Sequence, residues 1–436
     1  MKRILLLLLT LTSCTLIESP INPSQNKNLS LDRYDYTLNE NDIAVYLSTI
    51  YPQTKSAVSI KPYTVDNDTV MFEVRLDGKF KLFTADKRLP IILAFNDKTD
   101  NIDISSNPAL KTWIDIEAKN IQYFMKNYKD SVDNQNTRIW NKIFLKYIGP
   151  QTKAEGDPDE EEGYWRWISC DTTYMELDDN NHLINTHWHQ ANPYNSKCPT
   201  IRYSSAHTPA GCVAVAGAQM LNFLYHKYGV PEEIPGEYEL DGWSTSAQSN
   251  GYEPENTTKE SIYWTNIQNM DSSTIASLIA WIGYEVDTEY TSNESYAYTS
   301  DLENFFEDQG IYCTYSQYSG TTALQSIRSG MPVIISGRIF QNGVDVGGHA
   351  FIADRYRIQI FHTEDLYEYV PHCNGGVSTG ETKIVTDEVY DYYLGMNFGW
   401  ENSIYDEIFV STVTLDFYNF EVPYENRYMI HNFRVN

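Results

Sequence analysis

The residue best suited to covalent chemistry in this 436-residue chain is Cys212. It follows Gly211 and opens a run of small and apolar residues, 213–221, which predicts a buried helix. A thiol at a helix N-terminus lies beside unpaired backbone N–H groups at the positive end of the helix dipole. Both features favour the thiolate, which is the nucleophilic form of cysteine, so we predict Cys212 as a nucleophile.

A nucleophilic cysteine needs a base and a group that orients the base. His349 is the candidate base, because Gly347 and Gly348 before it leave room for the close approach of a backbone. Asn397 is the candidate orienting group, since its side chain can fix the tautomer of an imidazole. His349 lies 137 residues and Asn397 185 residues after Cys212 (349 − 212 and 397 − 212), so the fold must bring the three together. A single cysteine in an apolar run is otherwise a small core residue.

Acyl transfer also needs a donor for the developing oxyanion besides the backbone N–H of the nucleophile. Gln190, 22 residues before Cys212 (212 − 190), is the candidate donor. We expect Trp400 to form an aromatic lid or a wall of the substrate cleft, with core packing as the alternative. Gly211 and Gly348 are expected to lie along the same cleft.

Two further histidines, His187 and His189, alternate with Trp188 and would lie on one face of a strand. This spacing suggests a metal site, but no carboxylate lies at a suitable spacing, so we predict surface histidines. His372-Cys373 offers two more potential zinc ligands, but the chain has no C-x-x-C spacing. The sequence therefore predicts no metal and no organic cofactor.

Four ordered motifs surround the candidate residues. They read W-x-Q-x-x-P-Y-N, G-C-V-A-x-A-x-A-Q, G-G-H-A and N-x-G-W, starting at residues 188, 211, 347 and 397. The set resembles the streptopain family of papain-like cysteine peptidases over about residues 165–435. The chain departs from the family pattern at Phe398, where the family usually has Trp, and at Glu401-Asn402, where it usually has Gly-Gly.

The resemblance implies a fold and a set of roles. The fold is of the α+β class, with a papain-like two-lobed peptidase domain preceded by a small α+β prodomain. Cys212 would be the nucleophile, His349 the base, Asn397 the orienting group and Gln190 the oxyanion donor. A preference for an apolar residue two positions before the cut is also implied. The strand expected at residues 89–95 looks like one found in the propeptides of that family.

The predicted function is therefore a cysteine endopeptidase made as a zymogen. Its partners would be protein or peptide substrates, its own propeptide as an inhibitor, and a dedicated inhibitor protein as a further candidate. Two alternatives stay open: a catalytically decayed envelope lipoprotein on a peptidase scaffold, and a relative that transfers the acyl group to an amine. The second would include peptidoglycan-directed enzymes, which usually carry repeated wall-binding modules that this sequence lacks.

The charge of the chain excludes some partners. With 59 acidic against 32 basic residues, the formal net charge is −27. Such a chain is repelled by nucleic acid and by anionic membrane surfaces. An acidic surface is compatible with solubility outside the cell.

The N-terminus is predicted to be a targeting segment. Lys2-Arg3 precedes the apolar run 4–11, which is too short to span a bilayer. The run ends in Leu11-Thr12-Ser13-Cys14, which resembles a bacterial lipobox, so Cys14 is the candidate lipidation site. The expected location is the cell envelope, at the outer membrane or cell surface, with membrane contact only through the lipid. An ordinary signal peptide, followed by secretion, is the alternative.

The expected organisation follows from these segments. We predict a lipoprotein signal peptide at 1–14, a tether at 15–31, a propeptide domain at 32–148, an acidic linker at 149–163 and a peptidase domain at 164–436. The linker carries six acids within the eight residues 155–162, so it should be extended and exposed, and we expect activation cleavage within 149–167. The remaining cysteines allow three disulfide pairings, and none is assigned: Cys170, Cys198, Cys313 and Cys373.

Hydrophobic periodicity and turn residues predict the elements that must position the site. Helices are expected at residues 37–51, 108–126, 212–228, 272–286 and 300–309. Strands are expected at 69–76 and 79–84, joined by the hairpin turn Asp77-Gly78, and at 89–95, 331–340, 344–357, 390–397 and 408–410. Residues 241–260 are expected to form a loop.

Overall fold

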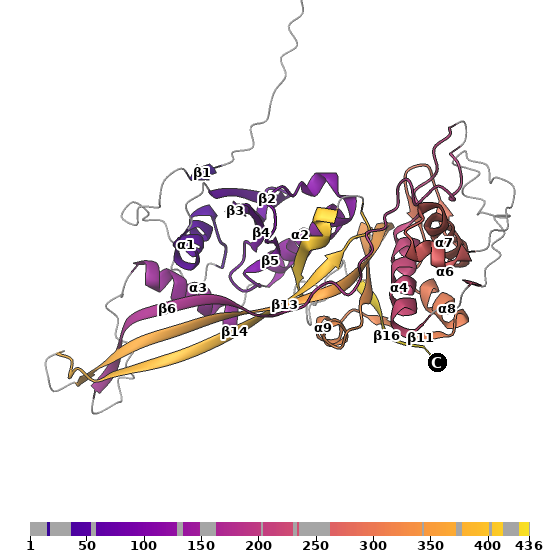
Figure 1. Cartoon of the computed structure of the whole chain (residues 1–436). Helices are drawn as coiled ribbons and strands as arrows, with labels where there is room; N and C mark the ends of the chain where they lie inside the picture. The colour runs from indigo at the N-terminus through magenta and orange to yellow at the C-terminus, as the bar shows by residue number, and fades with distance from the viewer. Residues whose placement is uncertain are drawn as a thin grey trace, which may run out of the picture. The chain divides into compact units, whose positions relative to one another are not determined.

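The computed structural model describes residues 15–17, 36–53, 58–128, 134–148, 163–201, 204–229, 233–234, 262–341, 344–371, 377–400, 403–412 and 427–435. The described residues form a mixed α+β structure, which confirms the predicted class (Figure 1). The chain divides into two compact units. Unit 1 consists of residues 1–101, 125–175 and 360–389, and unit 2 of residues 102–124, 176–359 and 390–436. The predicted lipidation site Cys14, the acidic stretch 151–162, the 241–260 loop and Cys373 lie outside the described residues.

Unit 1 contains an antiparallel sheet in the order β2-β3-β4-β5. Its strands are β2 (Val58–Val65), β3 (Asp68–Leu76), β4 (Lys79–Thr84) and β5 (Ile92–Asn96), and the short β1 (Thr15–Ile17) pairs with β2. The predicted hairpin is confirmed: Asp77 and Gly78 have φ values of 50° and 72°, as the tight turn between twisted strands requires. The strand predicted from residue 89 begins three residues later, at Ile92.

Two helices complete the core of unit 1. They are α1 (Glu40–Ile50) and α3 (Gln135–Ile148). Asn39 caps α1 and forms a capping box with Asp42, as a helix start with this spacing favours. The ring of Tyr46 on α1 lies 5.3 Å from Phe83 on β4 and 5.4 Å from Trp140 on α3, and all three side chains are fully buried. This aromatic cluster joins both helices to the sheet.

Three long strands contribute residues to both units: β6 (Gly163–Asp179), β13 (Val344–Pro371) and β14 (Thr382–Asn397). They lie side by side, with β13 between β6 and β14 (Figure 1). The sequence prediction ended the middle strand at residue 357, which is 14 residues too early (371 − 357). Arg355 and Arg357 do not end the strand, because Asp179 on β6 accepts a hydrogen bond from each at 3.3 and 3.1 Å.

Unit 2 combines a helical cluster with antiparallel strands. Its helices are α4 (Cys212–Tyr228), α6 (Trp264–Gln268), α7 (Ser272–Glu285), α8 (Asp301–Asp308), α9 (Gly320–Arg328) and most of α2 (Pro108–Asn127). Its strands include β11 (Ile311–Gln317), β12 (Val333–Gln341), β15 (Ile408–Ser411) and β16 (Arg427–Val435), in the sheet order β15-β14-β13-β12-β16-β11. The short strands β7 (Glu233–Ile234) and β8 (Ile262–Tyr263) pair with each other, as do β9 (Glu289–Tyr290) and β10 (Ser295–Tyr296).

Small residues let other helices pack closely on α4. A Cβ at Gly217 would lie 2.6 Å from Leu302 of α8 and 3.2 Å from Ile282 of α7, so no larger residue fits without a shift. The apolar face of α4 meets buried residues of α7 and α8 and the sheet residues Ile334 and Ile352. The core of unit 2 therefore holds the helix that begins with Cys212.

The two units do not follow the predicted order of domains along the chain. Residues 102–124 of the predicted propeptide belong to unit 2 with most of the predicted peptidase. Residues 163–175 and 360–389 belong to unit 1 with the N-terminal residues. The predicted boundaries also concern cleavage and maturation, and they stay a prediction.

Candidate active site

Cys212 is the first residue of α4, as predicted. Gly211 caps the helix with φ 90° and ψ 132°, a conformation that favours glycine. Gly211 itself is buried and, contrary to the prediction, is not among the residues that line the cleft. A Cβ there would lie 3.5 Å from Thr288 and 3.6 Å from Ser295. The role of Gly211 is to turn the backbone into α4. The Cys212 thiol, which is partly exposed, accepts a hydrogen bond of 3.3 Å from the backbone N–H of Ala350.

His349 lies on β13, opposite Gly337 of β12. Its Nε2 forms a 3.1 Å hydrogen bond with the backbone carbonyl of Phe398. The residue before it must be glycine, since a Cβ at Gly348 would lie 2.6 Å from the carbonyl oxygen of Gly337. The Gly-His-Ala sequence therefore brings both the imidazole of His349 and the N–H of Ala350 to Cys212.

The pKa values of Cys212 and His349 shift toward an ion pair. Burial alone would raise the pKa of the Cys212 thiol, but the charge and hydrogen bond of His349 and the N–H of Ala350 outweigh it, and the pKa is lowered. Burial alone would lower the pKa of His349, but the Cys212 thiolate and the Phe398 carbonyl raise it. Both shifts therefore favour a thiolate beside an imidazolium.

Two other cysteines behave in the opposite way. Burial raises the pKa of Cys198 to about 12, and burial together with Glu303 and Glu307 raises the pKa of Cys313 to about 12. Like Cys212, both are free thiols in the structure. A thiol with so high a pKa is a poor nucleophile at neutral pH, so Cys212 has the chemical character that Cys198 and Cys313 lack.

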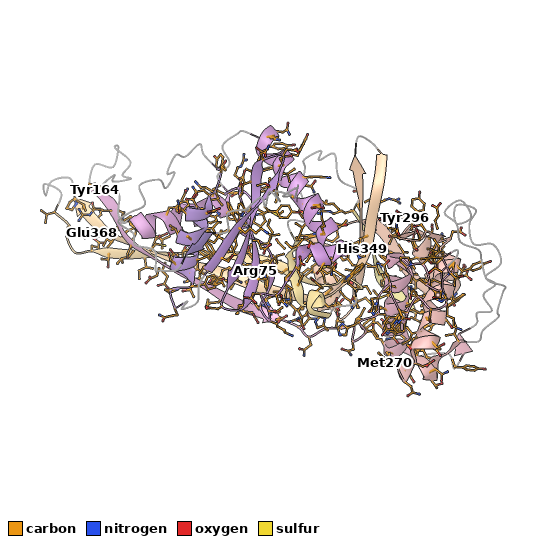
Figure 2. All side chains as sticks on the ribbon, turned by 90° about the horizontal axis from the view of Figure 1, so that it is seen from above. Arg75, Tyr164, Met270, Tyr296, His349 and Glu368 are labelled. Carbon is orange, nitrogen blue, oxygen red and sulfur yellow. The ribbon has the colours of Figure 1, made fainter. Side chains whose placement is uncertain are left out.

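Cys212 and His349 line a cleft of about 520 Å³ within unit 2. Three more predicted residues line it as well: Gln190, Gly348 and Trp400. The segment 292–296 contributes another part of the wall, and Figure 2 labels His349 and Tyr296 among the side chains. The carbonyl of Gln190 accepts a 2.9 Å hydrogen bond from the N–H of Ala210, which ties the Gln190 segment to the chain just before Cys212.

The contact with the imidazole that was predicted for Asn397 is made by the backbone carbonyl of Phe398. The imidazole bonds to the carbonyl of Phe398, while the Asn397 amide points elsewhere: its Nδ2 donates to Thr186 O at 2.9 Å and its Oδ1 accepts from Gly399 N at 3.1 Å. Asn397 is buried and fixes the backbone on both sides of Phe398. Its contribution to the imidazole is therefore indirect.

Helix α2 also reaches the cleft. Ala109 and Thr112 line it together with Cys212 and His349, although the sequence places them in the predicted propeptide. Glu117 on the same helix is fully buried and forms an ion pair with Arg427 of β16. Just before the helix, Ser106 Oγ lies 2.5 Å from the hydroxyl of Tyr405. These contacts all lie within unit 2 and hold α2 against the cleft.

Comparison with known proteins agrees with this geometry. The sequence matches the Peptidase C10 family over residues 188–408, which is 221 of 436 residues (408 − 188 + 1). The chain belongs to the peptidase C10 family. It is thus a cysteine peptidase, and the predicted resemblance to the streptopain family is confirmed.

Two solved structures resemble this C10 peptidase. One is a prointerpain A fragment from Prevotella intermedia, at 17% identity and a TM-score of 0.49, with 85% of this chain and 98% of that chain covered. The other is active wild-type interpain A from the same organism, at 18% identity and a TM-score of 0.37, with 59% and 98% covered. Among curated proteins, no match was found.

Gln219 joins the segments that build the site of this C10 peptidase. It lies on α4, seven residues after Cys212, and is buried. Its Oε1 accepts hydrogen bonds from Thr186 Oγ1 at 2.9 Å, from Trp188 N at 3.2 Å and from Asn397 Nδ2 at 3.3 Å. One amide thus connects α4, the segment before Gln190 and the chain before Phe398. Gln219 closes the G-C-V-A-x-A-x-A-Q motif, but its role could not be predicted from that position.

The prediction for the two neighbouring histidines was wrong for His189. That residue is buried, lines the cleft and packs edge-on against Tyr194 at 4.8 Å. His187 is half exposed, as expected of a surface histidine, but its Nδ1 lies 2.7 Å from Asp406 Oδ2. Asp406 follows it by 219 residues, so sequence spacing could not reveal this carboxylate.

Two further features are absent from the described part of the chain. No group of three or more His, Cys, Asp or Glu residues there could hold a metal ion. No helix among those residues is long and apolar enough to cross a membrane.

Proposed function

We propose that this C10 peptidase is an endopeptidase in which Cys212 is the nucleophile and His349 the base, and that it is made as a zymogen. The observation that carries the proposal is the cleft that holds Cys212, with its lowered pKa, beside His349, with its raised pKa. Gln190 lines the same cleft, and we assign its side-chain amide the role of oxyanion donor.

The reaction would follow the chemistry of a thiolate–imidazolium pair. The Cys212 thiolate attacks the peptide carbonyl, and the N–H of Cys212 with the side chain of Gln190 stabilises the oxyanion. His349 then gives its proton to the leaving amine, which leaves an acyl-enzyme. Water, activated by the neutral imidazole, hydrolyses the thioester and restores the pair. These residues carry out every step without a metal or cofactor.

Latency is supported by α2. Ala109 and Thr112 share the cleft with Cys212 and His349, so a substrate would compete with α2 for part of this space. The polypeptide between α3 and β6 contains the acidic run 155–162, which suits activation cleavage within 149–167. We propose that residues 32–148 act as the inhibitory propeptide until this cut is made.

Anchoring rests on the N-terminal sequence. We propose that Cys14 is lipidated and holds the protein at the bacterial cell envelope, because a short apolar run ends at Leu-Thr-Ser-Cys. Cys14→Ser should release the protein from the membrane fraction. An unmodified mature N-terminus at another residue would instead indicate an ordinary signal peptide.

The decisive test of function is labelling with an epoxide inhibitor of cysteine peptidases, followed by peptide mapping and a fluorogenic peptide assay. We expect one adduct, on Cys212, and loss of hydrolysis in step with labelling. Cys212→Ala should abolish hydrolysis, and His349→Ala should reduce it roughly a hundredfold or more. Labelling of another cysteine, or hydrolysis by the Cys212→Ala variant, would overturn the assignment. Absence of hydrolysis by the processed wild-type protein would favour a decayed scaffold.

A further inference from the structure

A chain of hydrogen bonds leads from the imidazole of His349 to the surface of unit 2. His349 Nε2 bonds to the carbonyl of Phe398 at 3.1 Å, and the N–H of the same residue donates to Asp406 Oδ1 at 3.2 Å. The second carboxylate oxygen, Oδ2, lies 2.7 Å from Nδ1 of His187. The Asp406 carboxylate thus binds both the N–H of Phe398 and the imidazole of His187.

The position of the Phe398 carbonyl matters because it is the acceptor that the imidazole meets. A catalytic histidine needs a partner that fixes its tautomer and ring orientation. A side chain can change its rotamer, but a backbone carbonyl moves only if the peptide units around it rotate. Any group that prevents this rotation also orients the imidazole.

Asp406 is placed to prevent it. Its side chain is only 2% exposed, whereas that of His187 is 50% exposed. Burial raises the pKa of Asp406, and the hydrogen bond and charge of His187 oppose that rise. The Asp406 carboxylate raises the pKa of His187 in turn. A buried carboxylate with one oxygen on a backbone N–H and the other on a surface imidazole has few alternative positions.

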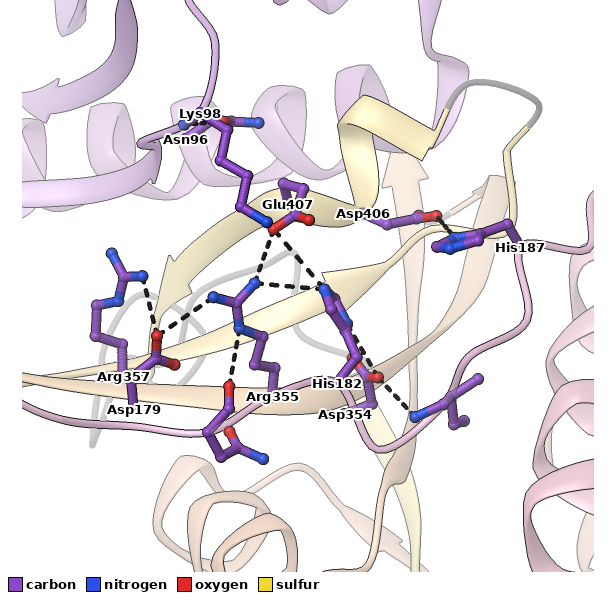
Figure 3. A network of polar contacts seen from close by, with 12 residues as sticks. Asn96, Lys98, Asp179, His182, His187, Asp354, Arg355, Arg357, Asp406 and Glu407 are labelled. Atoms are coloured by element: carbon purple, nitrogen blue, oxygen red, sulfur yellow. Dashed lines mark hydrogen bonds and ion pairs between the residues drawn. The ribbon is translucent and has the colours of Figure 1, made fainter. Parts of the chain in front are cut away.

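Other charged groups lie near this pair, and Figure 3 shows them. Asp354 and Glu407 act on His187 through their charges, and Asp354 also acts on Asp406. Asp354 is itself paired with His182 at 3.1 Å, and Glu407 with Arg355 at 2.7 Å. None of these four groups has a hydrogen bond to Phe398 among those described, so the His187–Asp406 pair differs from its neighbours in its link to the cleft.

We propose that Asp406 and His187 are positioning residues for the catalytic imidazole, acting through the backbone of Phe398. The inference rests on the proposed function, because it gives His349 the role of base. The sequence predicted that the side chain of Asn397 orients the imidazole. We assign this role instead to the Phe398 carbonyl and to the buried carboxylate of Asp406.

The nearby His182–Asp354 pair offers a matched control. It is also a partly exposed histidine on a fully buried carboxylate, with side-chain exposures of 22% and 0%. The Asp354 carboxylate also accepts a hydrogen bond from the N–H of Ile184, and not from that of Phe398. Replacing His182 therefore removes a comparable ion pair from the same network without touching Phe398.

The experiment compares Asp406→Asn, His187→Gln and the control His182→Gln in the processed enzyme. Two quantities are measured: kcat and KM on a fluorogenic peptide, and the pH dependence of Cys212 alkylation by iodoacetamide. Asp406→Asn should lower kcat by about tenfold or more, because a misplaced catalytic group can cost up to roughly a hundredfold. KM should change by less than about twofold, because the cleft walls are untouched. Alkylation should require a higher pH, since a less well placed imidazolium stabilises the thiolate less.

His187→Gln should shift both quantities in the same direction by a smaller factor, and His182→Gln should leave both at wild-type values. Wild-type kcat and alkylation in Asp406→Asn would overturn the proposal, as would equal losses in Asp406→Asn and His182→Gln. Thermal unfolding shows whether a variant is folded. If Asp406→Asn fails to fold, the His187→Gln variant tests the proposal in its place. If the wild-type enzyme alkylates at Cys212 but hydrolyses no peptide, the proposed function fails while the alkylation profiles still test the positioning.

Discussion

Two opposing effects set the charge of the Cys212 thiol. Burial favours the neutral thiol, while His349 and the N–H of Ala350 favour the thiolate and prevail. The pKa of Cys212 is lowered and that of His349 is raised, so both shifts favour the ion pair of thiolate and imidazolium. Below the pKa of Cys212 the thiolate gains a proton, and above the pKa of His349 the imidazolium loses one.

We therefore predict a bell-shaped pH profile of kcat/KM for the processed enzyme. Its acid limb should lie below the ordinary pKa of a cysteine and its alkaline limb above that of a histidine; both limbs belong to the coupled pair. In His349→Ala, alkylation of Cys212 should require a clearly higher pH. The same acid limb in wild type and His349→Ala would contradict the assignment of the base.

Gln219 gives a second prediction at this scale. Gln219→Leu should lower both stability and activity, because the N–H of Trp188 and the hydroxyl of Thr186 lose their buried acceptor. An unsatisfied buried group costs about 1–3 kcal/mol. Thermal unfolding and the peptide assay measure the two effects. Gln268→Leu, at an exposed site on α6, is the control and should leave both unchanged. Wild-type stability in Gln219→Leu would show that this amide is not a structural junction.

Sequence reasoning found the residues whose chemistry depends on their side chains. Cys212, His349, Gln190, Trp400 and Gly348 all line one cleft, as expected. It did not find the Phe398 carbonyl, because every residue carries a carbonyl and only the fold decides which one meets an imidazole. Asp406 and Gln219 escaped for a related reason. Both act on the backbone of distant segments, and no spacing in the sequence records such a contact.

At the scale of elements, prediction succeeded where local signals are strong. The bounds predicted for the helix of Cys212 agree with α4, since a glycine precedes it and Gly229 follows it. Helices near 108–126 and 272–286 were also confirmed to within a residue. β6 and β16 were not predicted, because each mixes charged and apolar residues and gains its stability from neighbours far along the chain.

The buried ion pair of α2 provides a prediction about latency. Glu117→Ala should loosen the helix, because it leaves Arg427 largely buried without this carboxylate, and breaking a buried pair costs about 3–5 kcal/mol. In the full chain carrying Cys212→Ala, hydrogen exchange of the α2 amides should accelerate. With Cys212 intact, Glu117→Ala should speed the appearance of processed enzyme.

The same helix contains its own control. Lys111 and Asp115 form an exposed i,i+4 pair with side-chain exposures of 49% and 33%. Lys111→Ala should change stability by no more than about 0.5 kcal/mol and leave hydrogen exchange near the wild-type rate. If both variants exchange alike, the Glu117–Arg427 pair does not hold α2 in place.

At the scale of the whole molecule, the segments that make up unit 1 predict whether the chain stays together after the linker is cut. Lys142 on α3 lies 2.7 Å from Thr363 Oγ1, 3.2 Å from Asp365 and 3.4 Å from Asp387, on β13 and β14. These contacts connect residues on opposite sides of the proposed cut without depending on the cut bond. A chain nicked between 149 and 162 should therefore stay together as one complex in size-exclusion chromatography.

This association should weaken in Lys142→Met. Loss of hydrogen bonds to charged groups costs about 1.5–3 kcal/mol, which corresponds to roughly a tenfold to hundredfold higher dissociation constant. Lys126→Met is the control, because its pair with Asp68 in unit 1 is exposed at 53% and 46%. Dilution of nicked Cys212→Ala protein measures both constants. Dissociation of the nicked wild-type chain at micromolar concentration would contradict the prediction.

The interleaving of segments in unit 1 also affects how the protein folds during and after its synthesis. The unit draws on residues up to 175 and then on residues from 360, an interruption of about 185 positions (360 − 175). During synthesis, the early strands and helices of unit 1 cannot complete their packing until β13 and β14 have been made. Contacts between residues so far apart in the sequence form slowly, because a long loop must be closed. Once residues 1–148 are removed, a denatured peptidase has lost the partner against which 360–389 assemble. We expect the precursor to recover its structure after dilution from urea, and the processed chain alone to remain trapped, so maturation would commit each molecule to a single folding event.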